Sequence, residues 1–181
     1  MKKLFACIAA LIALAFYVSS CEKDDLCPDG SLTTPSLVVE FYDKTNRSEV
    51  LPVDGLKYFA EGRVDTLVPG TASKIRVPLK TDMESTKWGF IWNRPSTTGV
   101  RPYLNYLDFK YIVSQAYISR ACGYRATFLL NAPTEGEANP VISTVTSPLW
   151  ISEVEIVDRN VVDEFETAEE DENDVHIKIY F

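Results

Sequence analysis

Short apolar segments alternate with turn-forming residues from Ser36 to Phe181, and none of these segments sustains a helical period. Side chains that alternate between apolar and polar along such a segment are typical of strands with one buried face. We therefore expect strands over 37–42, 50–53, 57–60, 73–79, 87–93, 106–113, 118–130, 150–157 and 175–181. About eight strands without crossover helices predict an all-β fold, most simply an antiparallel β-sandwich with immunoglobulin-like layering. A β-barrel is the alternative.

Several segments carry more specific expectations. Asp54-Gly55 is a hairpin-type dipeptide and predicts a turn between two short strands. Pro78 predicts that the strand over 73–79 lies at a sheet edge. The even positions from Cys122 to Leu130 are expected to share one face of a single strand. His176 is expected at the surface or at an edge, opposite Val175 and Ile177, and not in a catalytic role.

Aromatic side chains are concentrated in the middle of the chain. Trp88, Phe90 and Trp92 share one alternating face, which favours core packing. Tyr103 and Tyr106 lie beside the Pro95 to Pro102 loop and are expected to be accessible. Exposed flat rings are suited to stacking on sugars, so these two tyrosines are candidate ligand contacts.

The N-terminus reads as an export leader. Lys2 and Lys3 precede an apolar stretch of 15 residues, which is shorter than the roughly 20 that a membrane-spanning helix needs. Val18-Ser19-Ser20-Cys21 resembles the lipobox of bacterial lipoproteins. The resemblance implies cleavage before Cys21 and lipid attachment to its sulfur. We thus expect a signal peptide over 1–20, a lipidated tether over 21–35 and a folded domain over 36–181.

Charged residues follow the lipidated position. Lys23, Asp24 and Asp25 look like the lysine-plus-acidic export signal of Bacteroidetes-type lipoproteins. The resemblance implies display on the outer face of the outer membrane. The alternatives are a merely solvated tether and a periplasm-facing protein.

Two cysteines remain after cleavage and lipidation, Cys27 and Cys122. An exported compartment permits a disulfide, which here would close a loop of about 95 residues and stabilise the fold by roughly 4 to 5 kcal/mol in the chain-entropy model. Two free buried thiols are the alternative. We expect no metal site, since zinc needs about four ligands and no close cysteine pair exists.

The charge balance excludes other functions. The chain of 181 residues has 18 basic and 26 acidic side chains, a net charge of -8, and loss of the two leader lysines makes the mature net charge -10. Nucleic-acid binding needs clustered cations, and no basic stripe is present.

The acidic segment 163–174 offers oxygen ligands for calcium. It lacks the glycine turn and ligand spacing of an EF-hand loop, which favours a solvated hairpin tip.

Short motifs along the mature chain carry a wider resemblance. The lipobox, Cys27, Phe41-Tyr42-Asp43, the segment from Ser119 to Tyr124 and His176-Ile177-Lys178-Ile179 look like a Bacteroidetes-type lipoprotein family of unknown function. The resemblance supports the location, the cysteine pair and the all-β fold, and it implies no catalytic residues.

The residues together predict a non-enzymatic, lipid-anchored envelope protein that binds or supports other envelope components. It is expected to contact the membrane through its anchor, to contact envelope proteins or glycans, and to need no cofactor. A surface glycan-binding protein is the second hypothesis. The third is a small hydrolase that uses paired carboxylates.

Overall fold

The computed structural model describes residues 26–27, 34–96, 99–134, 136–144, 148–162 and 175–181. The chain divides into two compact units. We call the first the sandwich; it comprises residues 32–116 and 125–181. The second, the disulfide unit, comprises residues 1–31 and 117–124.

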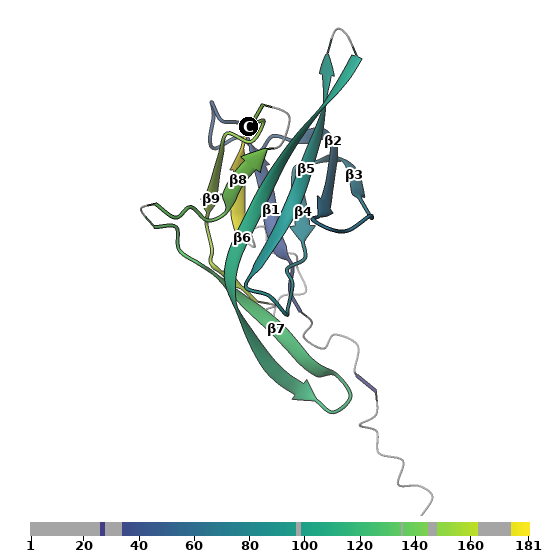
Figure 1. Ribbon diagram of the computed structural model, residues 1–181, viewed down its shortest axis with the longest axis vertical. Helices are drawn as coiled ribbons and strands as arrows, with labels where there is room; N and C mark the ends of the chain where they lie inside the picture. The colour runs from purple at the N-terminus through teal and green to yellow at the C-terminus, as the bar shows by residue number, and fades with distance from the viewer. Residues whose placement is uncertain (1–25, 28–33, 97–98, 135, 145–147, 163–174) are drawn as a thin grey trace, which may run out of the picture. The chain divides into compact units, whose positions relative to one another are not determined.

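Two sheets pack together to form the sandwich, and the described residues contain strands and no helix (Figure 1). The first sheet has the strand order β4 (Lys74–Val77), β1 (Leu37–Tyr42), β11 (Ile177–Tyr180) and β9 (Glu153–Ile156). The second has the order β10 (Asn160–Val161), β7 (Gly123–Leu130), β6 (Gly99–Ser119), β5 (Ser85–Ser96), β2 (Val53–Ala60) and β3 (Leu67–Ala72), and β8 (Val141–Thr144) also pairs with β6. The predicted all-β sandwich is confirmed, and neither sheet closes on itself in the described part of the chain.

Among the strand pairs whose register the described residues give, the pairing is antiparallel with one exception. β1 and β11 run parallel, with Val39 opposite Ile177 and Tyr42 opposite Tyr180. This pair joins the first and last described strands, so the two ends of the sandwich meet in the middle of one sheet. Because β11 is a central strand, most of its residues are buried on both faces of the sheet.

The core lies between the sheets and consists of the inward-facing positions of both. The longest antiparallel pair, β5 with β6, brings Trp88 opposite Leu107 and Phe90 opposite Asn105 on the inner face. Across the core the first sheet contributes Phe41 and Ile179, which are fully buried. Burial of such side chains contributes roughly 1.5 to 3 kcal/mol each, and this is the main stabilising term of the fold.

The predicted hairpin at Asp54-Gly55 is wrong. A single strand, β2, runs through both residues, and Gly55 has φ +67°. The pairing of β2 with β3 shifts register between Val53 and Leu56, so the glycine accommodates a bulge where a turn was expected. A Cβ at this position would lie 3.3 Å from the Cβ of Asn93, which leaves little room for a larger residue.

The single strand predicted over 118–130 is also wrong. β6 ends at Ser119 and β7 begins at Gly123, whose φ of +71° is that of a turn glycine. Ala126, Phe128 and Leu130 are buried as the alternation predicted. Tyr124, which was expected on the same face, is 70% exposed.

Eleven strands are described, more than the eight or so expected from the sequence. The strands without a prediction are β3, β8 and β10, which have six, four and two residues. β3 has no buried residue and contains Pro69 and Gly70, so it lacks the apolar alternation by which strands are found. Pairing with β2, and not its own composition, makes it a strand.

Candidate functional site

A half-open pocket of about 410 Å³ lies in the sandwich beside the aromatic end of β5 and β6. Four aromatic residues line it, namely Trp92, Tyr103, Trp150 and Phe181. The other lining residues are Lys44, Leu51, Arg94, Pro148, Leu149 and Ser152. We call this set the aromatic pocket. Its volume falls in the range of small-molecule sites, which are typically apolar with a few polar groups.

The four rings of the aromatic pocket pack against one another. Trp92 lies 6.4 Å from Tyr103, 5.7 Å from Trp150 and 5.5 Å from Phe181, measured between ring centroids. Trp150 and Phe181 meet edge to face at 5.7 Å. Mutual packing holds each ring in place, so the pocket is preformed and its rings need little ordering when a ligand binds.

Two cations and no carboxylate side chain line the aromatic pocket. The Arg94 guanidinium lies 5.3 Å from the Trp92 ring centroid, in cation–π range. The Lys44 backbone N–H donates a hydrogen bond of 3.3 Å to the Phe181 carbonyl, and Lys44 is an exposed lining residue of the pocket. Within the described part of the chain, neither Lys44 nor Arg94 forms an ion pair. Both side chains are exposed and available as donors.

The two candidate tyrosines lie on opposite faces of β6. Tyr103 pairs with Trp92 across the β5–β6 ladder and faces the aromatic pocket. Tyr106 pairs with Gly89 and meets Phe59 edge to face at 6.0 Å, with the Lys87 ammonium 4.8 Å from its ring centroid. Side chains alternate between the two faces of a strand, so residues three positions apart point in opposite directions. Only Tyr103 therefore belongs to the pocket.

The aromatic face of β5 is divided between core and pocket. Trp88 and Phe90 are buried, as predicted, and the Trp88 indole donates a hydrogen bond of 3.0 Å to the Pro78 carbonyl. Trp92 is only half buried and forms a wall of the aromatic pocket. The sequence pattern correctly places all three on one face. Burial differs along that face because Trp92 lines the aromatic pocket, whereas Trp88 and Phe90 lie in the core.

A polar residue fixes the floor of the aromatic pocket. Asn105 is fully buried, and its Oδ1 accepts hydrogen bonds from the backbone N–H groups of Trp150 at 2.8 Å and Ile151 at 3.0 Å. The Trp150 indole N–H donates to the Phe90 carbonyl at 3.2 Å. These bonds fasten the segment before β9 to the inner face of the second sheet. Sequence reasoning missed Asn105, and its one signal is a polar residue at an inward position of an alternating strand.

The expectation of a surface His176 is wrong. The side chain is 7% exposed, and its Nδ1 accepts a hydrogen bond of 3.1 Å from the Val38 N–H. The His176 N–H donates in turn to the Val38 carbonyl at 3.1 Å. The imidazole therefore extends the parallel pairing of β1 and β11 and has a structural role.

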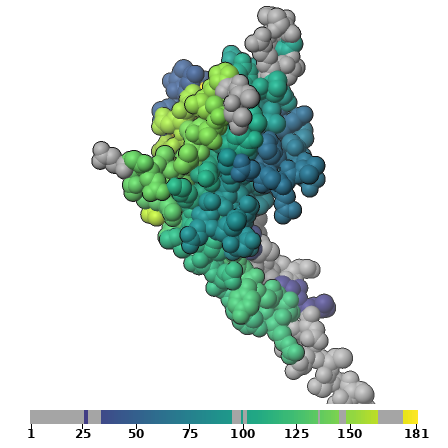
Figure 2. Space-filling model, in the orientation of Figure 1, coloured from purple at the N-terminus to yellow at the C-terminus, as the bar shows by residue number. Residues whose placement is uncertain are grey.

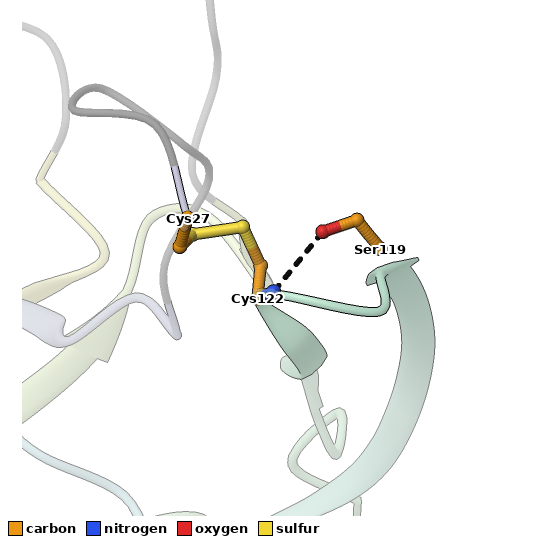
Figure 3. The surroundings of a disulfide bond; sticks show 3 residues. All are labelled: Cys27, Ser119 and Cys122. Carbon is orange, nitrogen blue, oxygen red and sulfur yellow. Dashed lines mark hydrogen bonds between the residues drawn. A yellow bond between two sulfur atoms is a disulfide. The ribbon is translucent and has the colours of Figure 1, made fainter. Parts of the chain in front are cut away.

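The predicted cysteine pair is confirmed as a disulfide in the disulfide unit. Cys27 and Cys122 are bonded, with their Cα atoms 4.8 Å apart. Figure 3 shows the bridge next to the β6–β7 turn, where the Cys122 N–H donates to the Ser119 hydroxyl at 3.0 Å. The Cys27 and Cys122 sulfurs are thus committed to a structural bond.

One pair of neighbouring carboxylates in the described residues, Glu153 and Glu155, takes part in ion pairs. Glu153 binds both guanidinium nitrogens of Arg47, and one of these nitrogens also contacts Glu155 at 3.3 Å. The hydrogen bond from Arg47 lowers the pKa of Glu153. A general acid needs a raised pKa, so this cluster favours a charge network over hydrolysis. No group of three or more metal-ligating side chains occurs in the described residues.

A second hollow, which we call the edge groove, has a volume of about 720 Å³. The strands on its two sides are β8 and β9, one from each sheet. The segments 138–142 and 152–157, which line it, lie on the face seen in Figure 2, coloured green to yellow-green. Val154 and Ile156 line the groove and also pack on the core.

Three sets of predicted residues lie outside the described part of the chain. They are the lipidation residue Cys21, the export residues Lys23, Asp24 and Asp25, and the acidic segment 163–174. The residues that are described contain no helix long and apolar enough to cross a membrane.

Comparison with known proteins gives no relative for this chain: no family model, no curated protein and no solved structure matches it.

Proposed function

We propose that this protein is a lipid-anchored, non-enzymatic protein of the cell envelope that binds a saccharide in its aromatic pocket. The observation that carries the binding proposal is the set of four packed rings around a half-open volume of about 410 Å³. The anchoring proposal rests on the leader and on Val18-Ser19-Ser20-Cys21. The resemblance of these residues to a lipobox, and the export-like Lys23-Asp24-Asp25, support placement on the outer membrane, facing out.

The chemistry of the aromatic pocket favours a saccharide. A sugar ring has an apolar face that packs on a flat aromatic ring, and hydroxyl groups at its edge that need hydrogen-bond partners. Tyr103 and Trp92 offer such rings, while Arg94, Lys44 and Ser152 offer polar groups around them. A small number of polar groups around an apolar floor is the usual composition of a site that orients its ligand.

The role of Tyr103 can be tested directly. A panel of neutral and acidic oligosaccharides titrated into the protein by calorimetry should include at least one binder. We expect Tyr103→Ala to weaken that binding at least about tenfold, which corresponds to about 1.4 kcal/mol. The reason is the loss of one wall of the pocket, since Tyr103 packs against Trp92.

Tyr106→Ala is the matched control because it removes the same side chain from the other face of the same strand. We expect its affinity for the same oligosaccharide to stay within about twofold of the parent. Binding that survives Tyr103→Ala, or that weakens equally in both variants, would contradict the assignment of the pocket. If no oligosaccharide in the panel binds, the saccharide proposal fails and structural support of other envelope components becomes the better hypothesis.

Surface display has a separate test. We expect alanine at all three positions of Lys23–Asp25 to reduce cleavage of the protein by protease added to intact cells, because the proposed export signal is lost. The control carries alanine at Lys80, Asp82 and Glu84, a replacement with the same change in charge at exposed sites of the sandwich. Protease sensitivity that is unchanged by the first replacement contradicts surface export and favours a periplasm-facing protein.

A further inference from the structure

The disulfide unit contains a pair of tyrosines that the core does not explain. Tyr117 and Tyr124 are 58% and 70% exposed, and their rings meet edge to face with centroids 5.3 Å apart. One tyrosine lies near the end of β6 and the other at the start of β7, on either side of the turn that holds Cys122. We call this turn and its two tyrosines the hairpin tip, residues 117–124.

The disulfide places the hairpin tip close to the proposed lipid anchor. Cys21 and Cys27 are six positions apart, and a fully extended chain spans at most about 3.6 Å per residue, so Cys27 lies within roughly 22 Å of the lipidated residue. Cys27 is bonded to Cys122, and the Cα atoms of this pair are 4.8 Å apart. A lipidated Cys21 lies at the membrane surface, so the hairpin tip is confined to the neighbourhood of that surface.

The hairpin tip itself carries one charged side chain, Arg120, and no carboxylate. The acidic residues nearest to the hairpin tip in the sequence are Asp108 and Glu135, so a stretch of 26 residues, 109–134, has no carboxylate side chain in a chain that has 26 acidic residues in all. The same stretch contains a lysine and two arginines, and one of them, Arg120, is exposed within the hairpin tip. The tether that the disulfide joins to this turn carries Glu22, Asp24, Asp25 and Asp29 against Lys23. The attraction to anionic headgroups therefore belongs to the turn alone, and the membrane contact depends mainly on its two tyrosines.

Tyrosine is the side chain expected at such a location. Tyrosine and tryptophan are enriched where a protein meets the headgroup layer, because the ring is apolar and the hydroxyl stays hydrated. We propose that the hairpin tip is a membrane-contact site, at which Tyr117 and Tyr124 lie in the headgroup layer next to the lipidated Cys21. This inference rests on the proposed lipid anchor. Its consequence is an anchored protein held at the membrane by two points, the acyl chains and the hairpin tip.

The test uses the full, lipidated protein in vesicles of phosphatidylethanolamine and phosphatidylglycerol with brominated acyl chains, which quench nearby tryptophan. Tyr124→Trp adds a reporter at the hairpin tip, and Val64→Trp adds one at a 97% exposed position of the sandwich. The three native tryptophans are common to both variants and to the parent, and their quenching is subtracted. We expect the added tryptophan at 124 to be quenched at least about twofold more than the one at 64.

A third variant tests whether the disulfide keeps the hairpin tip close to the lipid anchor. Tyr124→Trp combined with Cys27→Ala and Cys122→Ala keeps the anchor and releases the hairpin tip from it, so we expect quenching to fall to the level of Val64→Trp. Quenching of Tyr124→Trp that is no greater than that of Val64→Trp overturns the membrane-contact site. Quenching that persists without the disulfide overturns the role of the bridge. A blue shift of the Tyr124→Trp emission that depends on protein concentration in the water-soluble Cys21→Ala form overturns the proposal in favour of contact between copies.

Flotation of every variant with the vesicles separates this inference from the proposed anchor. A protein that floats and shows no extra quenching at 124 retains its anchor and loses the membrane-contact site. A parent protein that fails to float refutes the anchor, and the inference built on the anchor falls with it.

Discussion

A Cys21→Ala variant is expected to leave the membrane fraction completely when its leader is replaced by an ordinary secretory leader. Each buried CH2 of an acyl chain contributes about 0.8 kcal/mol, so the several chains of a bacterial lipoprotein bind almost irreversibly, and their loss leaves nothing comparable. The ordinary leader is needed because an uncleaved apolar segment over 4–18 would itself hold the protein at the membrane. Cell fractionation with immunoblotting measures the result.

Cys7→Ala provides the matched control, because Cys7 lies in the leader and is expected to be removed with it. This variant should stay in the membrane fraction and should have the same mature mass as the parent. A Cys21→Ala protein that remains with the membranes behind an ordinary leader contradicts lipidation. The hairpin tip alone, with its two tyrosines, is expected to be too weak an attachment to survive fractionation.

An Asn105→Leu variant is expected to lose about 2 to 6 kcal/mol of unfolding free energy. Asn105 is fully buried, and its side-chain oxygen is the acceptor for the N–H groups of Trp150 and Ile151. Leucine has a similar volume but no acceptor, so two buried donors lose their partner, and each unsatisfied group costs about 1 to 3 kcal/mol. The loss is large against the 5 to 15 kcal/mol by which a typical domain is stable.

Urea unfolding followed by fluorescence, with the disulfide intact and Cys21 replaced to give a water-soluble protein, measures this loss. Asn93→Ala is the control, since within the described residues the half-buried Asn93 side chain donates one hydrogen bond, to the Gly55 carbonyl at 3.2 Å. We expect that variant to lose no more than about 1 kcal/mol. Equal stability of Asn105→Leu and the parent would show that the segment before β9 is held by its apolar contacts alone.

The two asparagine variants also bear on the pocket. Asn105 holds the backbone of Trp150, and Trp150 forms the floor on which Trp92 and Phe181 pack. A moderate loss of stability in Asn105→Leu should therefore be accompanied by a loss of oligosaccharide affinity, even though Asn105 does not line the pocket. Asn93→Ala should leave the affinity unchanged.

The alternation of apolar and polar residues was sufficient to predict the sandwich, because a strand with one buried face must repeat with a period of two. The same pattern placed Trp88, Phe90 and Trp92 together. Tyr103 and Tyr106 were both candidates because they lie beside the Pro95 to Pro102 loop, and only Tyr103 lines the pocket. The alternation failed at Gly55 and at Gly123, where a glycine with positive φ occurs in a bulge and in a turn. A glycine in the sequence permits both conformations, and only the pairing of neighbouring strands selects one.

By itself the sequence determined the all-β class and the inward faces of most main strands, both of which depend on local periodicity. It gave Cys27 and Cys122 as a candidate pair, with two free thiols as the alternative, and the structure shows the bond. Tertiary structure alone decided the rest. The parallel pairing of β1 with β11 joins segments more than a hundred residues apart, and it buries His176 between them. The aromatic pocket needs Trp92 and Tyr103 from one sheet and Trp150 and Phe181 from distant segments. No local sequence pattern encodes these long-range contacts, because they depend on how the two sheets pack against each other.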